Sequence, residues 1–154
     1  PTEFLYPDAG SEVAQQPDAR PARKYIDAAT FDAQSGNIEA TDVRQGIRGL
    51  RQRAFGKSGT WLGYRRLDFS PGVCRVCLEA TGHPAGRGDY PVKLAFRLDA
   101  PDGPTVGTVE LTEDGPVEET TELVKKITGK HDLYIVNTTE EKWHFIRLYG
   151  FRFK

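Results

Sequence analysis

Aromatic residues near predicted loops are the part of this sequence best suited to hold a ligand. They are Phe55, Trp61, Tyr64, Tyr90, Trp143 and Tyr149. Exposed rings stack on the apolar faces of sugars while polar neighbours bind the hydroxyls, although core packing is the commoner role of any one ring. We expect Trp61, inside a predicted strand, to lie in the core. Trp143 follows the polar segment 138–142 and is the best candidate for an exposed platform.

The sequence lacks the residue patterns of common catalytic sites. The acidic pairs Glu118–Glu119 and Glu140–Glu141 are adjacent, so they would point to opposite sides of a strand and could not flank one scissile bond. A Gly-x-Ser-x-Gly elbow and the usual glycine-rich phosphate loops are missing from the chain. These observations predict a protein that is not an enzyme.

The two cysteines do not suggest a disulfide or a zinc site. Cys74 and Cys77 are three apart in a predicted strand, which would point them to opposite faces, and the three histidines lie at no ligand spacing from them. We predict two unpaired thiols, at least one of them in the core.

Length and composition favour one soluble, turn-rich domain. The chain has 154 residues with 21 Lys and Arg against 22 Asp and Glu, 16 Gly and 10 Pro. A net charge of −1 argues against a generally basic nucleic-acid binder, and the absence of a long apolar run argues against a membrane span. The sequence contains no signal-peptide pattern and no Met, so we expect a segment of a longer protein.

Charge is unevenly distributed along the chain. Residues 44–75 hold eight cations and one anion, Asp68, whereas residues 102–124 hold seven anions and no cation. One interpretation is that the two segments pair across neighbouring strands. The other is a basic groove for an acidic glycan or another anion.

Short segments rich in β-branched and aromatic residues alternate with Gly, Pro and Asp turn signals, which predicts an all-β sandwich of two antiparallel sheets. The predicted strands are 25–27, 36–40, 49–54, 60–69, 73–80, 92–99, 105–112, 120–127, 132–137 and 146–153. Residues 118–127 also have some helical periodicity, but we favour a strand there.

Residues 1–24, with four prolines and an apolar cluster at 4–6, are expected to be a linker or a wrapping tail before a domain at 25–154.

Simple alternation assigns faces to two of these strands. It places Leu94, Phe96 and Leu98 on one face of their strand. In the last strand it places Ile146, Leu148, Gly150 and Arg152 on one face, and Arg147, Tyr149, Phe151 and Phe153 on the other.

Five segments in order together resemble a bacterial carbohydrate-binding module of family 6, a jelly-roll β-sandwich. The segments are 25–36 (Tyr-Ile-Asp-Ala-Ala-Thr-Phe-Asp-Ala-Gln-Ser-Gly), 55–64 (Phe-Gly-Lys-Ser-Gly-Thr-Trp-Leu-Gly-Tyr), 96–109 (from Phe-Arg-Leu-Asp to Val-Gly-Thr-Val), 129–136 (Gly-Lys-His-Asp-Leu-Tyr-Ile-Val) and 151–153 (Phe-Arg-Phe). Their spacing is compatible with the family over nearly the whole chain from residue 25.

The resemblance implies a binding site in the loops at one end of the sandwich, where two rings clamp a sugar and an Asn binds it. Phe55 stands where the first ring would be, the second ring falls near Val117, and the Asn falls near Arg147. Two of the three determinants are therefore changed. Either this site is lost, or Trp143 and Arg147 rebuild it for a different, neutral or acidic, sugar, and we add His144 beside Trp143 as a candidate.

The resemblance also implies a biological setting. We expect a non-catalytic module of a secreted, extracellular, periplasmic or cell-surface polysaccharide-degrading enzyme, covalently linked to a glycoside hydrolase domain and binding xylan or β-glucan chains. The alternative is a structural module that has lost sugar binding and packs on a catalytic neighbour. The family's calcium site, which takes acidic side chains from the first and last strands, would use Asp27, although Tyr149 replaces the usual Asp at the far end.

Overall fold

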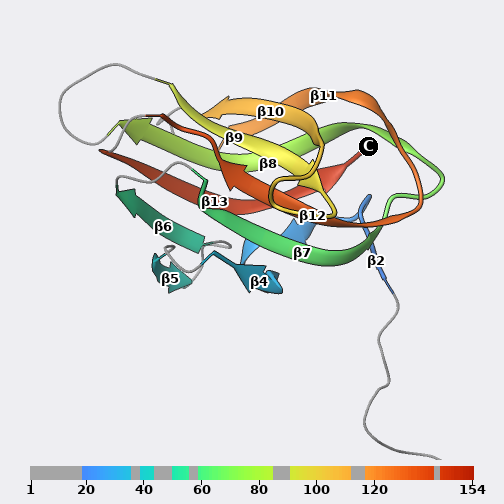
Figure 1. Cartoon of the computed structure of the whole chain (residues 1–154), viewed down its shortest axis with the longest axis horizontal. Helices are drawn as coiled ribbons and strands as arrows, with labels where there is room; N and C mark the ends of the chain where they lie inside the picture. The colour runs from blue at the N-terminus through green and yellow to red at the C-terminus, as the bar shows by residue number, and fades with distance from the viewer. Residues whose placement is uncertain are drawn as a thin grey trace, which may run out of the picture.

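The protein folds as a β-sandwich of two sheets, each of six strands within the described part of the chain (Figure 1). The structure, a computed structural model, describes residues 19–35, 39–43, 50–55, 59–84, 91–111, 117–140 and 143–154. Its elements are β2 (Arg20–Pro21), β3 (Ile26–Asp27), the short 3-10 helix η1 (Ala28–Thr30), β4 (Ala33–Gln34), β5 (Glu39–Val43), β6 (Leu50–Phe55), β7 (Trp61–Asp68), β8 (Val73–Pro84), β9 (Val92–Leu98), β10 (Thr105–Leu111), β11 (Val117–Ile127), β12 (Lys130–Asn137) and β13 (Trp143–Phe153). The predicted all-β class is confirmed, and the segment with helical periodicity is the strand β11.

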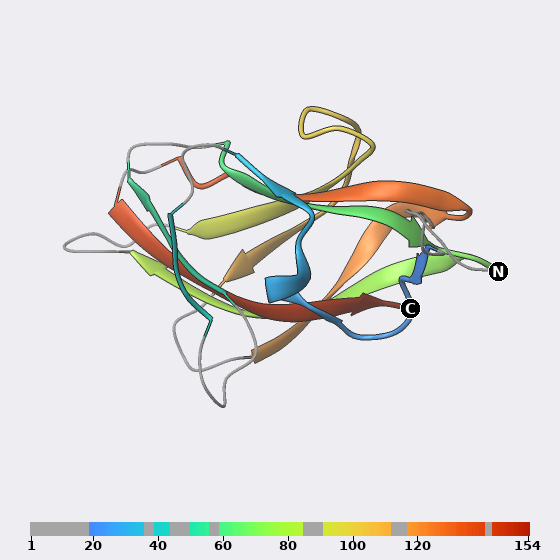
Figure 2. The ribbon, with the colours of Figure 1, turned by 90° about the horizontal axis from the view of Figure 1, so that it is seen from below.

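The two sheets are built from strands that are far apart in the sequence. The first sheet has the order β10-β9-β12-β7-β2, with β4 also paired to β7, and the second sheet has the order β11-β8-β13-β6-β5, with β3 also paired to β13. Neighbouring strands are antiparallel except β2 and β7, which are parallel. Figure 2 shows the two layers from a second direction, with the C-terminal end of β13 close to β2. Among the described residues, no helix is long and apolar enough to cross a membrane.

The core lies between the sheets and is filled by the alternating apolar residues of both. In β9, Leu94, Phe96 and Leu98 are buried together, as the alternation predicts. Rings from both sheets meet edge to face, with centroids 4.9 Å apart for Tyr64 and Phe151. Burial of this apolar surface is the main stabilising contribution to the fold.

A β-bulge in β13 overturns our assignment of faces in the last strand. Ile146, Leu148, Phe151 and Phe153 are all at most 1% exposed and belong to one core. The register of β13 against β8 shifts between Leu148 and Gly150, so Tyr149 is an extra residue and the alternation changes phase there. Arg147 and Tyr149 before the bulge, and Arg152 after it, therefore lie on the outer side of the second sheet.

A segment that we call the N-terminal clasp, residues 19–35, ties the two sheets together. The Ala22 N–H donates to the Asp68 carbonyl in the first sheet at 2.8 Å, and the Ala22 carbonyl accepts from the Phe153 N–H in the second sheet at 2.9 Å. Residues 19–24, which we expected in a linker or wrapping tail, thus lie on the sandwich. Residues 1–18, with the apolar cluster 4–6, lie outside the described residues.

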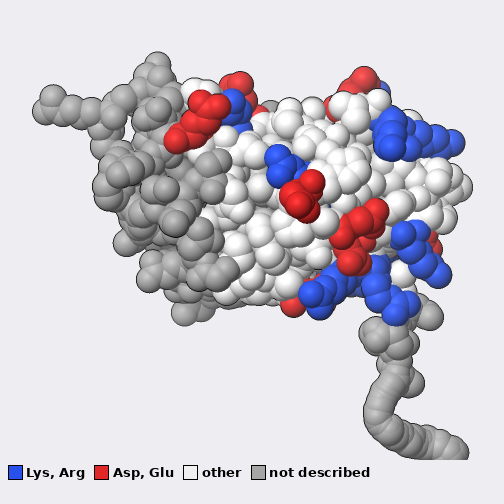
Figure 3. Space-filling model, in the orientation of Figure 1, with Lys and Arg blue, Asp and Glu red and all other residues white. Residues whose placement is uncertain are grey.

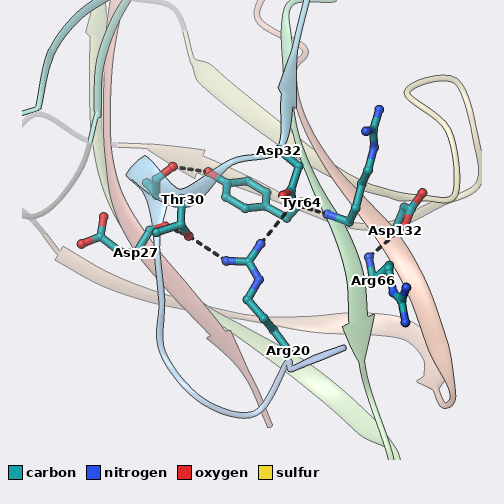
Figure 4. A network of polar contacts seen from close by, with 9 residues as sticks. Arg20, Asp27, Thr30, Asp32, Tyr64, Arg66 and Asp132 are labelled. Carbon is teal, nitrogen blue, oxygen red and sulfur yellow. Dashed lines mark hydrogen bonds and ion pairs between the residues drawn. The ribbon is translucent and has the colours of Figure 1, made fainter. Parts of the chain in front are cut away.

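Side-chain hydrogen bonds hold the clasp in place (Figure 4). Arg20 donates through Nη1 to Thr30 Oγ1 at 2.8 Å and through Nη2 to Asp32 Oδ2 at 3.2 Å. Asp32 Oδ2 also accepts from the Arg65 N–H in β7 at 2.7 Å. Tyr64 is fully buried and its hydroxyl donates to the Ala28 carbonyl at 2.8 Å, and this burial raises the pKa of Tyr64. Each of these polar groups therefore has a partner.

Candidate functional site

The strand register brings Phe55 and Trp143 together. Phe55 is the last residue of β6 and Trp143 is the first residue of β13, and the two stand directly opposite each other in the second sheet. His144, next along β13, is opposite Ala54 on one side and Pro84 on the other. Three of the predicted site residues therefore share one end of the sandwich, adjoining the segment between β6 and β7 and the segment between β12 and β13.

Arg147 and Val117 stand away from that end. Arg147 is four residues further along β13, which is about 13 Å in an extended strand, and it faces Arg51 on β6 and Thr81 on β8. Val117 begins β11 and is opposite Ala80, with β8 lying between β11 and β13. The register thus separates these two residues from the pair at the end of the sheet.

The surroundings of Arg147 are those of a half-buried cation on the outer face of the second sheet. Its neighbours in sequence, Ile146 and Leu148, point into the core. Its Nη1 donates to the Tyr149 hydroxyl at 3.4 Å, and Tyr149 is 6% exposed. The Arg147 Nε is buried and has no hydrogen-bond partner among the described residues.

The first sheet carries a second aromatic surface, which the sequence did not reveal. Trp61 and Tyr134 pack edge to face there, with centroids 5.2 Å apart. Trp61 is only half-buried and lies on the outer side, so our expectation that it belongs to the core is wrong. Tyr134 lies over Gly63, where a Cβ would come within 2.8 Å of its ring. The apolar run 133–136 conceals this arrangement, because Tyr134 looks like one more core residue of a buried strand.

Asp27 acts as a helix cap in this structure. Its Oδ1 accepts the Ala29 N–H at 3.0 Å and its carbonyl accepts the Thr30 hydroxyl at 2.7 Å. Within the described ranges, no three His, Cys, Asp or Glu side chains come together in a group that could hold a metal ion. Calcium binding at Asp27 stays a prediction.

The cysteines and the two charged segments are accounted for separately. Cys74 is exposed, Cys77 is buried and the two are not joined by a disulfide, which confirms the predicted thiols. Arg75 and Glu122 form an ion pair at 3.7 Å between β8 and β11, so one basic residue and one acidic residue of the two segments do pair across neighbouring strands. Figure 3 shows acidic and basic side chains lying close together over much of one face.

The arginines of β6 have different partners. Arg51 and Arg53 stand in register with Asp42 and Glu39 of β5, not with the acidic segment 102–124. An acidic residue on the adjacent edge strand is thus in register with each of these arginines. The residues in register with Arg147 on its two neighbouring strands are Thr81 and Arg51, neither of which is acidic.

A two-sheet sandwich with aromatic residues at one end and on one face is a scaffold for binding a ligand. The chain belongs to family 6 of the carbohydrate-binding modules, whose model matches residues 27–154. This family is one of non-catalytic, carbohydrate-binding modules.

Solved structures share the fold at low sequence identity. A family 6 module from Clostridium stercorarium in complex with cellobiose is 19% identical, with a TM-score of 0.66 over 88% of this chain and 96% of that one. A β-1,3-glucan-binding family 6 module from Bacillus halodurans is 18% identical, with a TM-score of 0.69 over 89% of this chain and 99% of that one. A family 43 arabinoxylan arabinofuranohydrolase from Bacillus subtilis, in complex with cellotetraose, is 20% identical, with a TM-score of 0.70 over 92% of this chain and 29% of that one.

Proposed function

We propose that this carbohydrate-binding module holds a polysaccharide chain at the end of the sandwich by stacking on Phe55 and Trp143. The observation that carries the proposal is the register of the second sheet, in which these two aromatic residues are cross-strand partners. Directly opposite residues in an antiparallel pair have Cβ atoms about 4.5–5.5 Å apart. That spacing is too small for a sugar between two rings. The proposed arrangement is therefore one continuous platform under the sugar.

The proposed ligands are xylan or β-glucan chains. The similar modules named above were found with cellobiose or described as binding β-1,3-glucan, and the arabinofuranohydrolase was found with cellotetraose. This chain matches only 29% of that enzyme, which supports the proposal that the module is covalently attached to a glycoside hydrolase. Because polysaccharides are substrates outside the cell, we propose an extracellular, periplasmic or cell-surface location.

Calorimetric titration with cello-, xylo- and β-1,3-gluco-oligosaccharides tests the proposed site. We expect Phe55→Ala and Trp143→Ala each to weaken binding about tenfold or more, because aromatic anchors dominate such interfaces. The matched control is Trp61→Ala, which removes a ring from the other sheet and should leave the affinity unchanged. A loss confined to Trp61→Ala would move the site to the outer face of the first sheet.

A second candidate function is a structural module that packs on a catalytic neighbour. The observation in its favour is that Val117 and Arg147 stand where the family would have a ring and an Asn. This function predicts that the unsubstituted protein gives no binding heat with any of the oligosaccharides. The first proposal requires binding heat with at least one of them.

A further inference from the structure

The most distinctive polar group outside the proposed platform is the guanidinium of Arg147. Its Nε is buried without a hydrogen-bond partner among the described residues. Buried donors in proteins are nearly always paired, and a donor that is not paired by the protein is a candidate to meet a bound ion or ligand. Arg147 as a whole is only half-buried, so the outer side of the sheet gives access to part of its side chain, and a ligand would reach Nε itself only by displacing what covers it.

The geometry of the guanidinium leaves one of its edges available. Nη1 is the nitrogen directed to the Tyr149 hydroxyl, at 3.4 Å. The Nε and Nη2 edge has no described partner, and two parallel N–H groups of this kind match the two oxygens of a carboxylate. The Tyr149 hydroxyl accepts from Arg147, so its own proton is free to be donated to a second acceptor.

Neighbouring charges make this position attractive to an anion. Arg51 is directly opposite Arg147 on β6, and like charges in that relation repel each other. Asp42 of β5 is in register with Arg51, but no acidic residue is in register with Arg147 on either neighbouring strand. Glu79, two positions from Thr81 on the same face of β8, accepts from the Tyr25 hydroxyl at 2.8 Å. An anion beside Arg147 would supply the missing negative charge and remove the repulsion.

We propose that Arg147, together with the Tyr149 hydroxyl and the positive charge of Arg51, binds the carboxylate of an acidic sugar unit on the outer face of the second sheet. This proposal rests on the proposed function and names the substrate class more closely: a glycan that carries uronic acid residues. The chain would run from the platform at Phe55 and Trp143 along β13, and about 13 Å separates the two positions, which is a span of a few sugar units.

The test compares acidic and neutral forms of the same sugar by calorimetry with the whole chain. Two pairs of probes serve: tetragalacturonate against its methyl ester, and xylotriose bearing a glucuronic acid against plain xylotriose. We expect the unsubstituted protein to bind the acidic sugar of at least one probe pair about tenfold more tightly than the neutral one. A hydrogen bond between charged groups contributes a gain in affinity of about this size. Arg147→Met should abolish that preference, and Arg147→Lys, which keeps the charge but not the fork, should retain part of it.

Arg152→Met is the matched control. Arg152 lies on the same strand and the same face, is exposed, and forms no ion pair with a described residue. Its removal changes the net charge equally and should leave the preference for the acid intact. Thermal unfolding of Arg147→Met should occur no lower than that of the unsubstituted protein, because the loss of one long hydrogen bond to Tyr149 is offset by the removal of a buried unpaired donor.

Two results would overturn the proposal. One is equal affinity for both members of both pairs, and the other is an equal loss in Arg147→Met and Arg152→Met, which would mean diffuse attraction without a site. Binding of neutral oligosaccharides distinguishes failure of the Arg147 site from failure of the proposed function. Binding of neutral chains with no preference for acids would contradict only the Arg147 site, whereas no binding of any chain would contradict both.

Discussion

Two arginines of this sandwich stand in opposite situations. Arg20 in the N-terminal clasp donates to Thr30 and Asp32, although its side chain is 35% exposed. Arg147 is in the middle of a sheet, and its buried Nε has no described partner. A donor that is paired within the protein stabilises the fold, whereas a buried donor that is left unpaired costs stability unless a ligand completes it. The contrast separates a region that holds the sheets together from the region that we propose to bind a carboxylate.

The largest effect is expected where the clasp crosses β13. A Cβ on Gly150 would collide with the Tyr25 ring and lie 2.7 Å from the Ile26 carbonyl oxygen. Gly150→Ala should therefore displace β3 and lower the free energy of unfolding by about 2 kcal/mol, in the range of overpacking effects. Chemical denaturation measures this change in the free energy of unfolding. Unchanged stability would mean that the clasp packs less tightly on β13 than its contacts indicate.

Tyr64→Phe tests the buried part of the clasp. The substitution keeps the ring but removes the donor to the Ala28 carbonyl, which would be left unpaired in a buried position. We expect a loss of about 1.5 kcal/mol in the free energy of unfolding. Phe96→Leu, which removes part of another fully buried ring without breaking a hydrogen bond, serves as a control for ring packing. If Tyr64→Phe has no effect, the hydroxyl does not hold η1 in place.

The direct test of the contrast pairs Arg20→Met with Arg147→Met. Loss of the partly exposed Arg20 contacts should cost about 0.5 kcal/mol, as surface ion pairs do. Arg147→Met should cost nothing or slightly stabilise the protein in the absence of ligand. Thermal unfolding of the two variants side by side gives the comparison, and a larger loss for Arg147→Met would reverse it.

A smaller effect is expected in the turn after β7. Hydrogen bonds from Ser70 hold the pKa of the exposed Asp68 below its usual value. A lowered carboxylate pKa contributes stability above the unfolded pKa, and that contribution is lost as the pH falls through the folded pKa. Asp68→Asn should thus reduce stability slightly at neutral pH and have no effect in strong acid. Unfolding curves at pH 7 and pH 2 test it, and an equal effect at both values would contradict the assignment to charge.

Sequence patterns were sufficient for the fold class. The alternation of Leu94, Phe96 and Leu98 identified a core strand, and turn signals gave ten strand segments, each of which overlaps a strand of the described residues. Alternation failed at Tyr149 because a bulge inserts one residue, and no residue type there announces the insertion.

The spatial arrangement of the site required the register of the strands. That Phe55 faces Trp143 follows from the pairing of β6 with β13, two strands separated by most of the chain. The same holds for Tyr134, whose place over Gly63 depends on the pairing of β12 with β7. Non-local pairing of this kind is set by the packing of the whole sandwich and leaves no local signal.

The peptide groups of Ala22 connect the two layers at one end of the sandwich. Since the N–H of this residue bonds one layer and its carbonyl bonds the other, the layers cannot shear past each other at this end without breaking at least one of the two bonds. Phe153, which donates to Ala22, and Trp143 are at opposite ends of β13. Slow amide exchange should therefore be concentrated around Phe153, and relative motion of the layers should grow toward the end where a glycan would be held. The proposed binding end could then adjust its width while the other end stays fixed, which suits glycan chains that vary in thickness and substitution.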